Sequence, residues 1–271
     1  MPRGLALSDH VTWWPSTLYQ TTTLELRRDG VRLLVDPGIA PWEIEEVVAA
    51  HPEPVGHVLL THADWDHVLG VPALPGARVT ASAGAAERIR SGTAREDVER
   101  ESREAYVTYG DLGLLRVDVA VEPPAEVDLG PWHVLARPAP GHTEDGLVTS
   151  FPDERLLVVG DYLSGLEIPA AYVSVSDYRE TLRMLIGVIE RERPAFVVVG
   201  HGPPHPAARA LAIADEDLDY IEGVLAFADA GCDPRHAERI AVPDRGGGPS
   251  DAASHVRNVE LACGERAAAP A

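Results

Sequence analysis

The pattern of hydrophobic and polar positions divides the chain into short strands that alternate with longer helices. Residues 21–38, TTTLELRRDGVRLLVDPG, contain two strand-like runs on either side of Asp29-Gly30, a pair favoured in tight hairpin turns. This segment therefore predicts a β-hairpin. The apolar runs at 57–61 and 78–82 predict two short buried strands.

Other segments show the spacing of an amphipathic helix. Residues 41–51 begin with proline followed by acidic residues, which is typical of a helix start. Residues 177–192 carry apolar side chains at 182, 185, 186 and 189, which form one stripe along a helix. Further helices are predicted to begin at about Gly84 and to span residues 208–231 and 254–263. The highly charged residues 92–105 predict an exposed helix or lid.

The second half of the chain repeats this alternation. Residues 115–159 predict successive strands, and 194–202 predict one more. Strand–strand–helix segments thus occur before and after about residue 130, which suggests two similar α/β layers packed on each other. We predict one α/β domain over residues 1–271, with a C-terminal helical extension at about 205–265.

Composition narrows the class of protein. The chain has 271 residues, of which 45% are hydrophobic, and this suits a single large α/β domain. Its formal net charge is −20 and it contains no lysine, so its basic side chains are scattered arginines. Nucleic-acid binding requires a clustered basic surface. We therefore expect a small-molecule substrate and no nucleic-acid partner.

Cysteine usage and the N-terminal segment bear on the compartment. The two cysteines, Cys232 and Cys263, are not in a CxxC pair, so we expect no disulfide scaffold and a reducing environment. The N-terminus lacks the apolar core of a signal peptide, and no run approaches the roughly 18 apolar residues of a membrane helix. We expect a cytoplasmic protein without membrane contact. Residues 267–271 are expected to be disordered, and the oligomeric state stays open.

Candidate chemistry gathers where the predicted strands end. THADWDH follows the apolar run HVLL and holds four possible metal ligands, and three later strands end in GH, GD and GH. Strand ends of a sheet meet at one edge, so these side chains are expected to lie together. Seven nitrogen and oxygen ligands are sufficient for two metal ions with a carboxylate between them. The seven candidates are His62, Asp64, Asp66, His67, His142, Asp161 and His201.

A purely structural interpretation of these segments has to be weighed. A single GH or GD pair after a strand is more often a turn than a ligand. Four such segments in this order are hard to explain as turns, and we therefore predict a metal site. The histidines His10, His51 and His133 lack this context, and we predict that they do not bind metal.

The motifs THADWDH, PGHT, GD and GHG resemble the successive metal motifs of the metallo-β-lactamase superfamily. DPG at 36–38 resembles the turn before the first helix of that family. The resemblance covers about residues 15–203. It implies a four-layer αββα sandwich with a binuclear metal site at one edge of the paired sheets, and zinc as the usual metal.

The resemblance also implies how the ligands are divided. Position 64 would join two histidines at a first metal, and a second set of three residues would hold the other. The first set is His62, Asp64 and His142, the second is Asp66, His67 and His201, and Asp161 would bridge the two metals.

Asp64 departs from the family pattern, because the chain has HxDxDH where HxHxDH is common. Asp64 could bind the first metal directly and make its ligand set richer in oxygen, which favours iron or manganese. Alternatively, the short side chain does not reach the metal, or it acts as a base on bound water. We favour direct binding.

The leading functional hypothesis is a metal-dependent hydrolase that directs a metal-bound hydroxide at a small thioester, lactone or related ester or amide. We assign the catalytic roles to Asp66 and Asp161. One alternative is a di-iron or mono-iron oxidoreductase of the same fold, motivated by Asp64. Another is a binding protein without catalysis. Specificity is expected to reside in the loops at 84–110 and 163–176.

Overall fold

The computed structural model describes residues 4–38, 40–105, 111–233 and 240–268, and its strands form two sheets. The seven-stranded sheet follows chain order: β1 (Leu5–Ala6), β2 (Val11–Pro15), β3 (Thr22–Arg28), β4 (Val31–Val35), β5 (Val55–Leu59), β6 (Arg78–Ser82) and β7 (Val119–Val121). The five-stranded sheet has the order β12 (Phe196–Val198), β11 (Leu156–Val158), β10 (Leu147–Phe151), β9 (Trp132–Pro138) and β8 (Ala125–Leu129).

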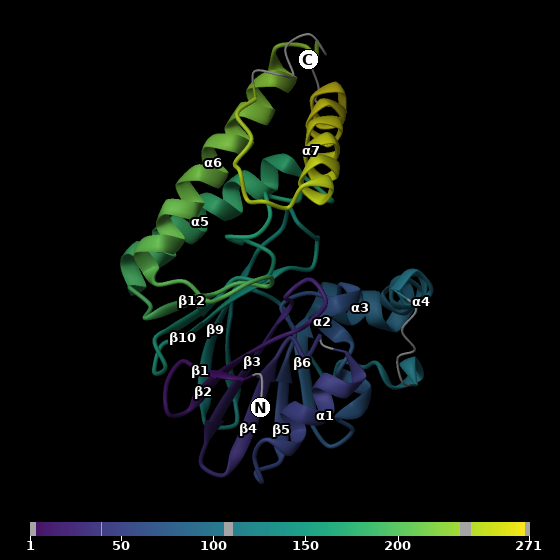
Figure 1. Ribbon diagram of the computed structural model, residues 1–271, viewed down its shortest axis with the longest axis vertical. Helices are drawn as coiled ribbons and strands as arrows, with labels where there is room; N and C mark the ends of the chain where they lie inside the picture. Colours follow the sequence, from purple (N-terminus) through teal and green to yellow (C-terminus); the bar gives the residue numbers. More distant parts are fainter. Residues whose placement is uncertain (1–3, 39, 106–110, 234–239, 269–271) are drawn as a thin grey trace.

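The described residues also form seven α-helices. Those of the first half are α1 (Pro41–Ala49), α2 (Trp65–Val68), α3 (Ala83–Ser91) and α4 (Thr93–Ala105). Those of the second half are α5 (Val175–Glu192), α6 (Ala207–Asp229) and α7 (Pro249–Ala268), which lie together at the upper end of the molecule in Figure 1. Short 3₁₀ helices span Val71–Ala73 and Leu112–Leu114.

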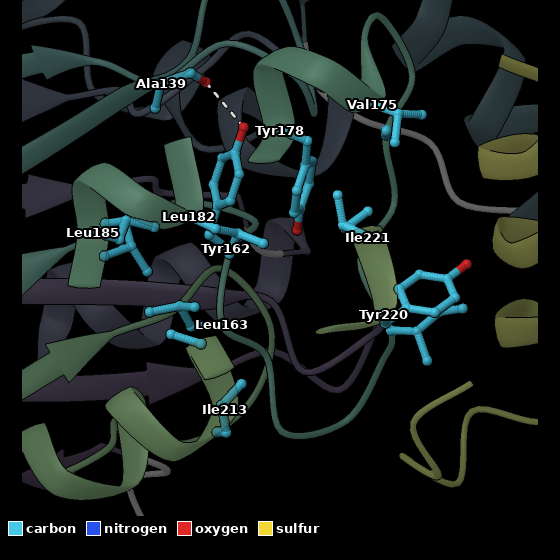
Figure 2. Packing of buried hydrophobic residues seen from close by; sticks show 14 of the residues in the cluster. Ala139, Tyr162, Leu163, Val175, Tyr178, Leu182, Leu185, Ile213, Tyr220 and Ile221 are labelled. Carbon is cyan, nitrogen blue, oxygen red and sulfur yellow. Dashed lines mark hydrogen bonds between the residues drawn. The ribbon is translucent and has the colours of Figure 1, made fainter. Parts of the chain in front are cut away.

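Three buried clusters separate four layers. One lies between the two sheets and contains Leu33 and Trp132. A second lies between the seven-stranded sheet and α1 to α4, and it contains Leu34. Leu33 and Leu34 join different clusters because successive side chains of a strand point to opposite faces. The third packs α5, α6 and α7 on the other sheet, with residues such as Leu182 and Ile213 (Figure 2). The fold is therefore the expected αββα sandwich.

The predicted hairpin at 21–38 is confirmed as β3 and β4, but the pattern predicted no strand before it. β2 presents four successive buried residues, Val11–Trp14, to the surrounding layers. A strand that is buried on both faces shows no alternation of polar and apolar residues. The usual strand signal is therefore missing from this segment.

We expected no disulfide scaffold, but the two cysteines form a disulfide. Cys232 follows α6, Cys263 lies in α7, and the structure joins them with their Cα atoms 6.1 Å apart. The packing of α6 against α7 brings together two positions that are 31 residues apart, so local spacing could not reveal the pair. The cysteines no longer support a reducing compartment. No helix in the described part of the chain is long and apolar enough to cross a bilayer.

The segment predicted at 92–105 as an exposed helix or lid is the helix α4, and its residues Ala94 and Val98 are buried on the side that packs against the fold. Residues 106–110, which belong to the loop expected to set specificity, lie outside the described residues. The tail expected to be disordered begins within α7, since residues 267 and 268 are helical. Residues 269–271 lie outside the described part of the chain.

α7 holds the loop that joins β11 to α5. The buried Asn258 of α7 donates to the Pro169 carbonyl oxygen at 2.6 Å and accepts from the Ala171 N–H at 2.9 Å. Further along the helix, Glu265 accepts from the Val175 N–H at 2.6 Å. The C-terminal helix therefore fixes the backbone of a loop that faces the candidate site.

Candidate metal centre

Four segments that carry possible ligands meet at one edge of the paired sheets. β9 and β11 both pair antiparallel with β10, and β12 pairs parallel with β11, so these three strands run in one direction. Their carboxyl ends are followed by His142, Asp161 and His201. THADWDH follows β5 of the other sheet, and its last residues begin the short helix α2. Strand direction thus explains why distant residues converge.

The structure brings all seven predicted residues together. They form three overlapping groups, in each of which the possible ligand atoms lie within 4.8 Å of one another. The groups are His62, Asp64 and His142; His62, His67 and Asp161; and Asp66, His67 and His201. This grouping is compatible with the two sites joined by Asp161 that the family resemblance implied, and the assignment of the ligands stays a prediction.

Asp161 lies at the centre of these groups. Its Oδ1 is 3.1 Å from His67 Nε2, and its Oδ2 is 3.2 Å from the Nε2 atoms of both His142 and His201. The side chain is also nearly buried. One carboxylate therefore faces histidines from both predicted metal sites.

The histidines are oriented by their outer ring nitrogens. His142 Nδ1 donates to the Ala170 carbonyl oxygen at 2.7 Å, and His201 Nδ1 lies 3.1 Å from the Tyr19 carbonyl oxygen. A proton on Nδ1 leaves the lone pair of Nε2 directed into the site, which is the tautomer that a metal ligand needs.

Asp36 orients a third histidine and was visible in the sequence only as part of the DPG turn. Its carboxylate accepts from the Thr61 N–H at 2.7 Å and from the Thr61 hydroxyl at 2.6 Å, and it lies 3.1 Å from His67 Nδ1. The turn must also pass very close to the backbone of Asp66. A side chain at Gly38 would collide with the Asp66 carbonyl group, which explains the glycine.

Unpaired buried atoms indicate what the site can accept. The Nε2 atoms of His62, His67 and His142 and the Oδ1 atom of Asp161 are buried without a hydrogen-bond partner among the described residues. Buried polar atoms normally have partners. Three imidazole nitrogens and a carboxylate oxygen that point at one another form a donor set suited to divalent zinc. The residues therefore fit the metal ions that the family implies.

The electrostatics favour a cation at the same point. Burial lowers the pKa of a histidine, yet neighbouring carboxylates, with Asp161 the strongest, together outweigh burial at His142 and His201. They raise the pKa of His142 well above the usual value and that of His201 to about 10. The carboxylates thus stabilise positive charge where the Nε2 atoms converge.

Asp64 is held by an arginine that sequence analysis did not single out. Its Oδ1 lies 2.8 Å from Arg88 Nη2, and its Oδ2 lies 3.5 Å from His142 Nε2. Arg88 also contacts the buried Asp145 at 2.9 Å, and Asp145 accepts from the Ala63 N–H at 2.9 Å. One oxygen of Asp64 is thus directed into the site. Arg88 could not be recognised because it is one of many arginines and its partners lie on other elements.

The same contacts keep Asp64 ionised. Burial favours the neutral acid, but the neighbouring His142, His62 and Arg88 outweigh it and hold the pKa of Asp64 far below the usual value. Asp64 is therefore a charged group with one oxygen available to a metal.

The histidines predicted not to bind metal lie elsewhere. His51 contacts Arg27 at 2.8 Å, and His133 lies near the surface, 3.0 Å from Asp128. Neither of them, nor His10, belongs to a group of possible ligands in the described part of the chain. Their exclusion as ligands stays a prediction, and this geometry supports it.

The candidate centre opens into a cavity of about 250 Å³. Aromatic side chains form part of its wall, and the rings of Tyr19 and Trp65 meet edge to face with centroids 5.8 Å apart. A second cavity of about 650 Å³ adjoins it. The residues common to both walls are Asp64, Trp65, Glu101 and Tyr172.

Comparison with known families agrees with this geometry. The family model of the metallo-beta-lactamase superfamily matches residues 16–201. The chain belongs to that superfamily. A comparison with curated protein sequences finds no match.

Several solved structures share the fold. The chain is 20% identical to the B3 metallo-beta-lactamase BLEG-1, with a TM-score of 0.61 over 74% of this chain and 96% of that one. It is 12% identical to the sec-alkylsulfatase Pisa1 from Pseudomonas sp., with a TM-score of 0.68 over 85% of this chain and 43% of that one. It is 17% identical to rubredoxin oxygen:oxidoreductase from Desulfovibrio gigas, with a TM-score of 0.54 over 81% and 62%. The chain thus spans less than half the length of the sulfatase. At these identities, the likeness shows the fold alone.

Proposed function

We propose that this protein is a metal-dependent hydrolase of a small acyl substrate, such as a thioester, a lactone or a related ester or amide. The observation that carries the proposal is the convergence of unpaired imidazole nitrogens on Asp161 at the wall of a cavity. Membership of the metallo-beta-lactamase superfamily supports hydrolysis in general. The choice among these acyl bonds rests on analogy with the family.

Seven residues would bind the metal ions. His62, Asp64 and His142 would hold one divalent ion, Asp66, His67 and His201 would hold the other, and Asp161 would lie between them. Bound ions would supply Lewis acidity and a water molecule of lowered pKa.

Asp66 is the carboxylate we expect to handle a proton. The Thr21 hydroxyl donates to its Oδ2 at 3.0 Å, and the same oxygen lies 3.4 Å from His201 Nε2. Asp66 also lines the cavity, so its oriented carboxylate is accessible to a bound substrate. This geometry supports a catalytic role in addition to metal binding.

The size and charge of the cavities support a small substrate. The cavity at the centre measures about 250 Å³, which suits a short acyl group. Its wall contains several carboxylates, among them Asp66, Asp161 and Glu167. A long polyanion such as RNA would be repelled by this wall and by the net charge of −20.

The test combines metal content with a substrate screen. The zinc-loaded protein is assayed against thioesters, lactones and phosphodiesters, and Asp161→Ala is compared with His133→Gln. Loss of the central carboxylate should lower the metal content and reduce hydrolysis by about 100-fold or more. His133→Gln should retain both. Full metal content and activity in Asp161→Ala would exclude this assignment of the centre.

A second candidate function is an iron-dependent oxidoreductase, which Asp64 favours because a carboxylate is a harder ligand than imidazole. Arg88 weakens this argument, since it binds one oxygen of Asp64 and withdraws part of its negative charge. Metal analysis after growth in mixed metals separates the two functions. Iron as the bound metal, with oxygen consumption and no hydrolysis, would favour the oxidoreductase.

A further inference from the structure

We infer that Arg257 forms an anion-binding subsite beside the candidate metal centre, and that the substrate carries an oxyanion, such as a carboxylate, near the bond that is cleaved. The second part rests on the proposed hydrolase function. The first part concerns binding alone and can be tested separately.

Arg257 is close to the centre although it belongs to the C-terminal helix. Its guanidinium carbon lies 4.3 Å from the centroid of the Tyr172 ring. That ring meets the His142 ring edge-on, with centroids 5.0 Å apart. Two successive ring contacts therefore connect the arginine to a predicted metal ligand. A small molecule could contact both Arg257 and the candidate metal centre.

Arg257 also differs from the other arginines of this region. Arg88 pairs with Asp64 and Asp145, and Arg100 pairs with Asp97 at 2.8 Å. Within the described part of the chain, Arg257 forms the cation–π contact with Tyr172 but no ion pair with a carboxylate. A guanidinium stacked on a ring keeps its N–H edges available for hydrogen bonds in the ring plane.

A cavity is present at this position. Arg257, Tyr172 and Thr143 all line the cavity of about 650 Å³. Thr143 Oγ1 is buried and has no hydrogen-bond partner among the described residues. The guanidinium of Arg257 is therefore the donor that this wall offers to an oxyanion, and the Thr143 hydroxyl is an unpaired polar group buried behind the wall.

None of the described acidic residues in the same wall forms an ion pair with Arg257. Asp64 and Asp97 are contacted by Arg88, and Glu101 is contacted by Arg100 at 3.3 Å. The remaining acid of the wall, Glu144, is exposed to solvent. The charge of Arg257 is therefore available to a ligand.

The binding test uses the zinc-loaded protein and two probes of similar length. Glutarate has two carboxylates and butyrate has one, so glutarate can bind zinc and Arg257 together. Calorimetry should give a dissociation constant at least about tenfold lower for glutarate than for butyrate, because a charge-assisted hydrogen bond contributes that much. Arg257→Gln should lose this preference and Arg257→Lys should retain part of it.

Arg266→Gln is the matched control, because Arg266 lies on the same helix and is about half exposed, 3.3 Å from Asp229. It should keep the preference for glutarate. A parent protein with equal affinity for the two probes would overturn the subsite, and so would an unchanged preference in Arg257→Gln. A merely structural role of Arg257 would lower thermal stability without changing the ratio of the two affinities.

A kinetic test links the subsite to catalysis. The ratio of kcat/KM for a glutaryl thioester to that for a butyryl thioester should fall about tenfold in Arg257→Gln. If the parent hydrolyses neither these thioesters nor any other ester or lactone, the proposed hydrolase function fails. The calorimetric ratio then still decides whether Arg257 binds an oxyanion.

Discussion

At Asp64 the chain places a carboxylate where the family pattern has an imidazole, and Arg88 contacts the outer oxygen of that carboxylate at 2.8 Å. Two divalent ions and three aspartates would leave about one positive charge at the centre. Arg88 adds a positive charge beside Asp64, but it shares that charge with the buried Asp145. An arginine from α3 therefore offsets the substitution in part, and a preference for iron does not follow from Asp64 alone.

Replacing Asp64 with Asn tests whether it binds metal. The amide keeps the shape and can still accept from Arg88, but it is a weaker ligand. Metal content after dialysis should fall toward one ion per chain, because Asp66, His67 and His201 remain. Asp97→Asn is the control, since Asp97 also contacts Arg88, at 3.6 Å, but belongs to no ligand group in the described part of the chain. Equal metal content in both variants would show that Asp64 does not touch a metal.

Arg88→Gln should destabilise the fold as well as the site. Asp145 is buried, and Arg88 is its charged partner at 2.9 Å. Removing one partner of a buried ion pair is costly, and because Arg88 is about one quarter exposed, we expect a loss of roughly 2–4 kcal/mol. Urea unfolding measures it. Arg90→Gln, a change to an exposed arginine of the same helix, should cost less than about 0.5 kcal/mol. A similar small loss in Arg88→Gln would contradict this interpretation.

At the scale of the elements, the sequence predicted those features that depend on residues close together in the chain. The hairpin at 21–38, the helix at 41–51 and the candidate ligands that follow strands could be recognised, because each depends on neighbouring residues. The Cys232–Cys263 pair and the contact of Arg88 with Asp64 were not visible, since both depend on how distant elements pack. The part of the site that escaped prediction is therefore the part that supports the ligands.

α7 is the element whose role was least predictable, and Asn258 tests it. Asn258→Ala would leave the Pro169 carbonyl group and the Ala171 N–H unpaired in a buried position. Each such group costs about 1–3 kcal/mol, so unfolding in urea should occur at a lower concentration. The Ala170 carbonyl that accepts from His142 lies between them. Hydrogen exchange of this loop should therefore accelerate.

Val256→Ala is the control for that variant, because Val256 lies on the same helix and is 54% exposed. It should change stability by less than about 0.5 kcal/mol. If Asn258→Ala leaves both the unfolding midpoint and the exchange rates of the loop unchanged, α7 does not hold the loop as described.

At the scale of the whole molecule, an excess of acidic groups shapes stability. The formal net charge of −20 makes the folded chain repel itself as carboxylates ionise. Among the carboxylates that are buried outside the ligand groups, Asp217 has a pKa raised by burial. Asp217 of α6 is 2% exposed, and Arg245 contacts it at 2.9 Å. Burial raises the pKa of Asp217 to about 7 although Arg245 opposes the shift.

The raised pKa predicts the direction of a pH effect on folding. Between about pH 4 and pH 7 the folded protein keeps a proton on Asp217, whereas the unfolded chain, with the ordinary pKa of 3.8, has released it. The unfolded state then binds fewer protons, so the free energy of unfolding falls as the pH rises through this window. The pKa of Asp217 differs by about three units between the folded and unfolded states. This difference limits the contribution of Asp217 to the free energy of unfolding to about 4 kcal/mol. Above pH 7 the contribution is constant.

Asp217→Asn removes the titrating group and should flatten this part of the pH dependence. Urea unfolding gives the free energy of unfolding of the parent and of the variant at pH 5 and at pH 8. The loss of stability of each protein is the decrease in that free energy from pH 5 to pH 8. The general repulsion among carboxylates acts on both proteins, so the difference between the two losses isolates Asp217. Asp215→Asn removes one exposed carboxylate from the same helix and should behave like the parent. If Asp217→Asn loses as much stability as the parent between pH 5 and pH 8, the carboxylate is already ionised at pH 5, and its ion pair with Arg245 outweighs its burial.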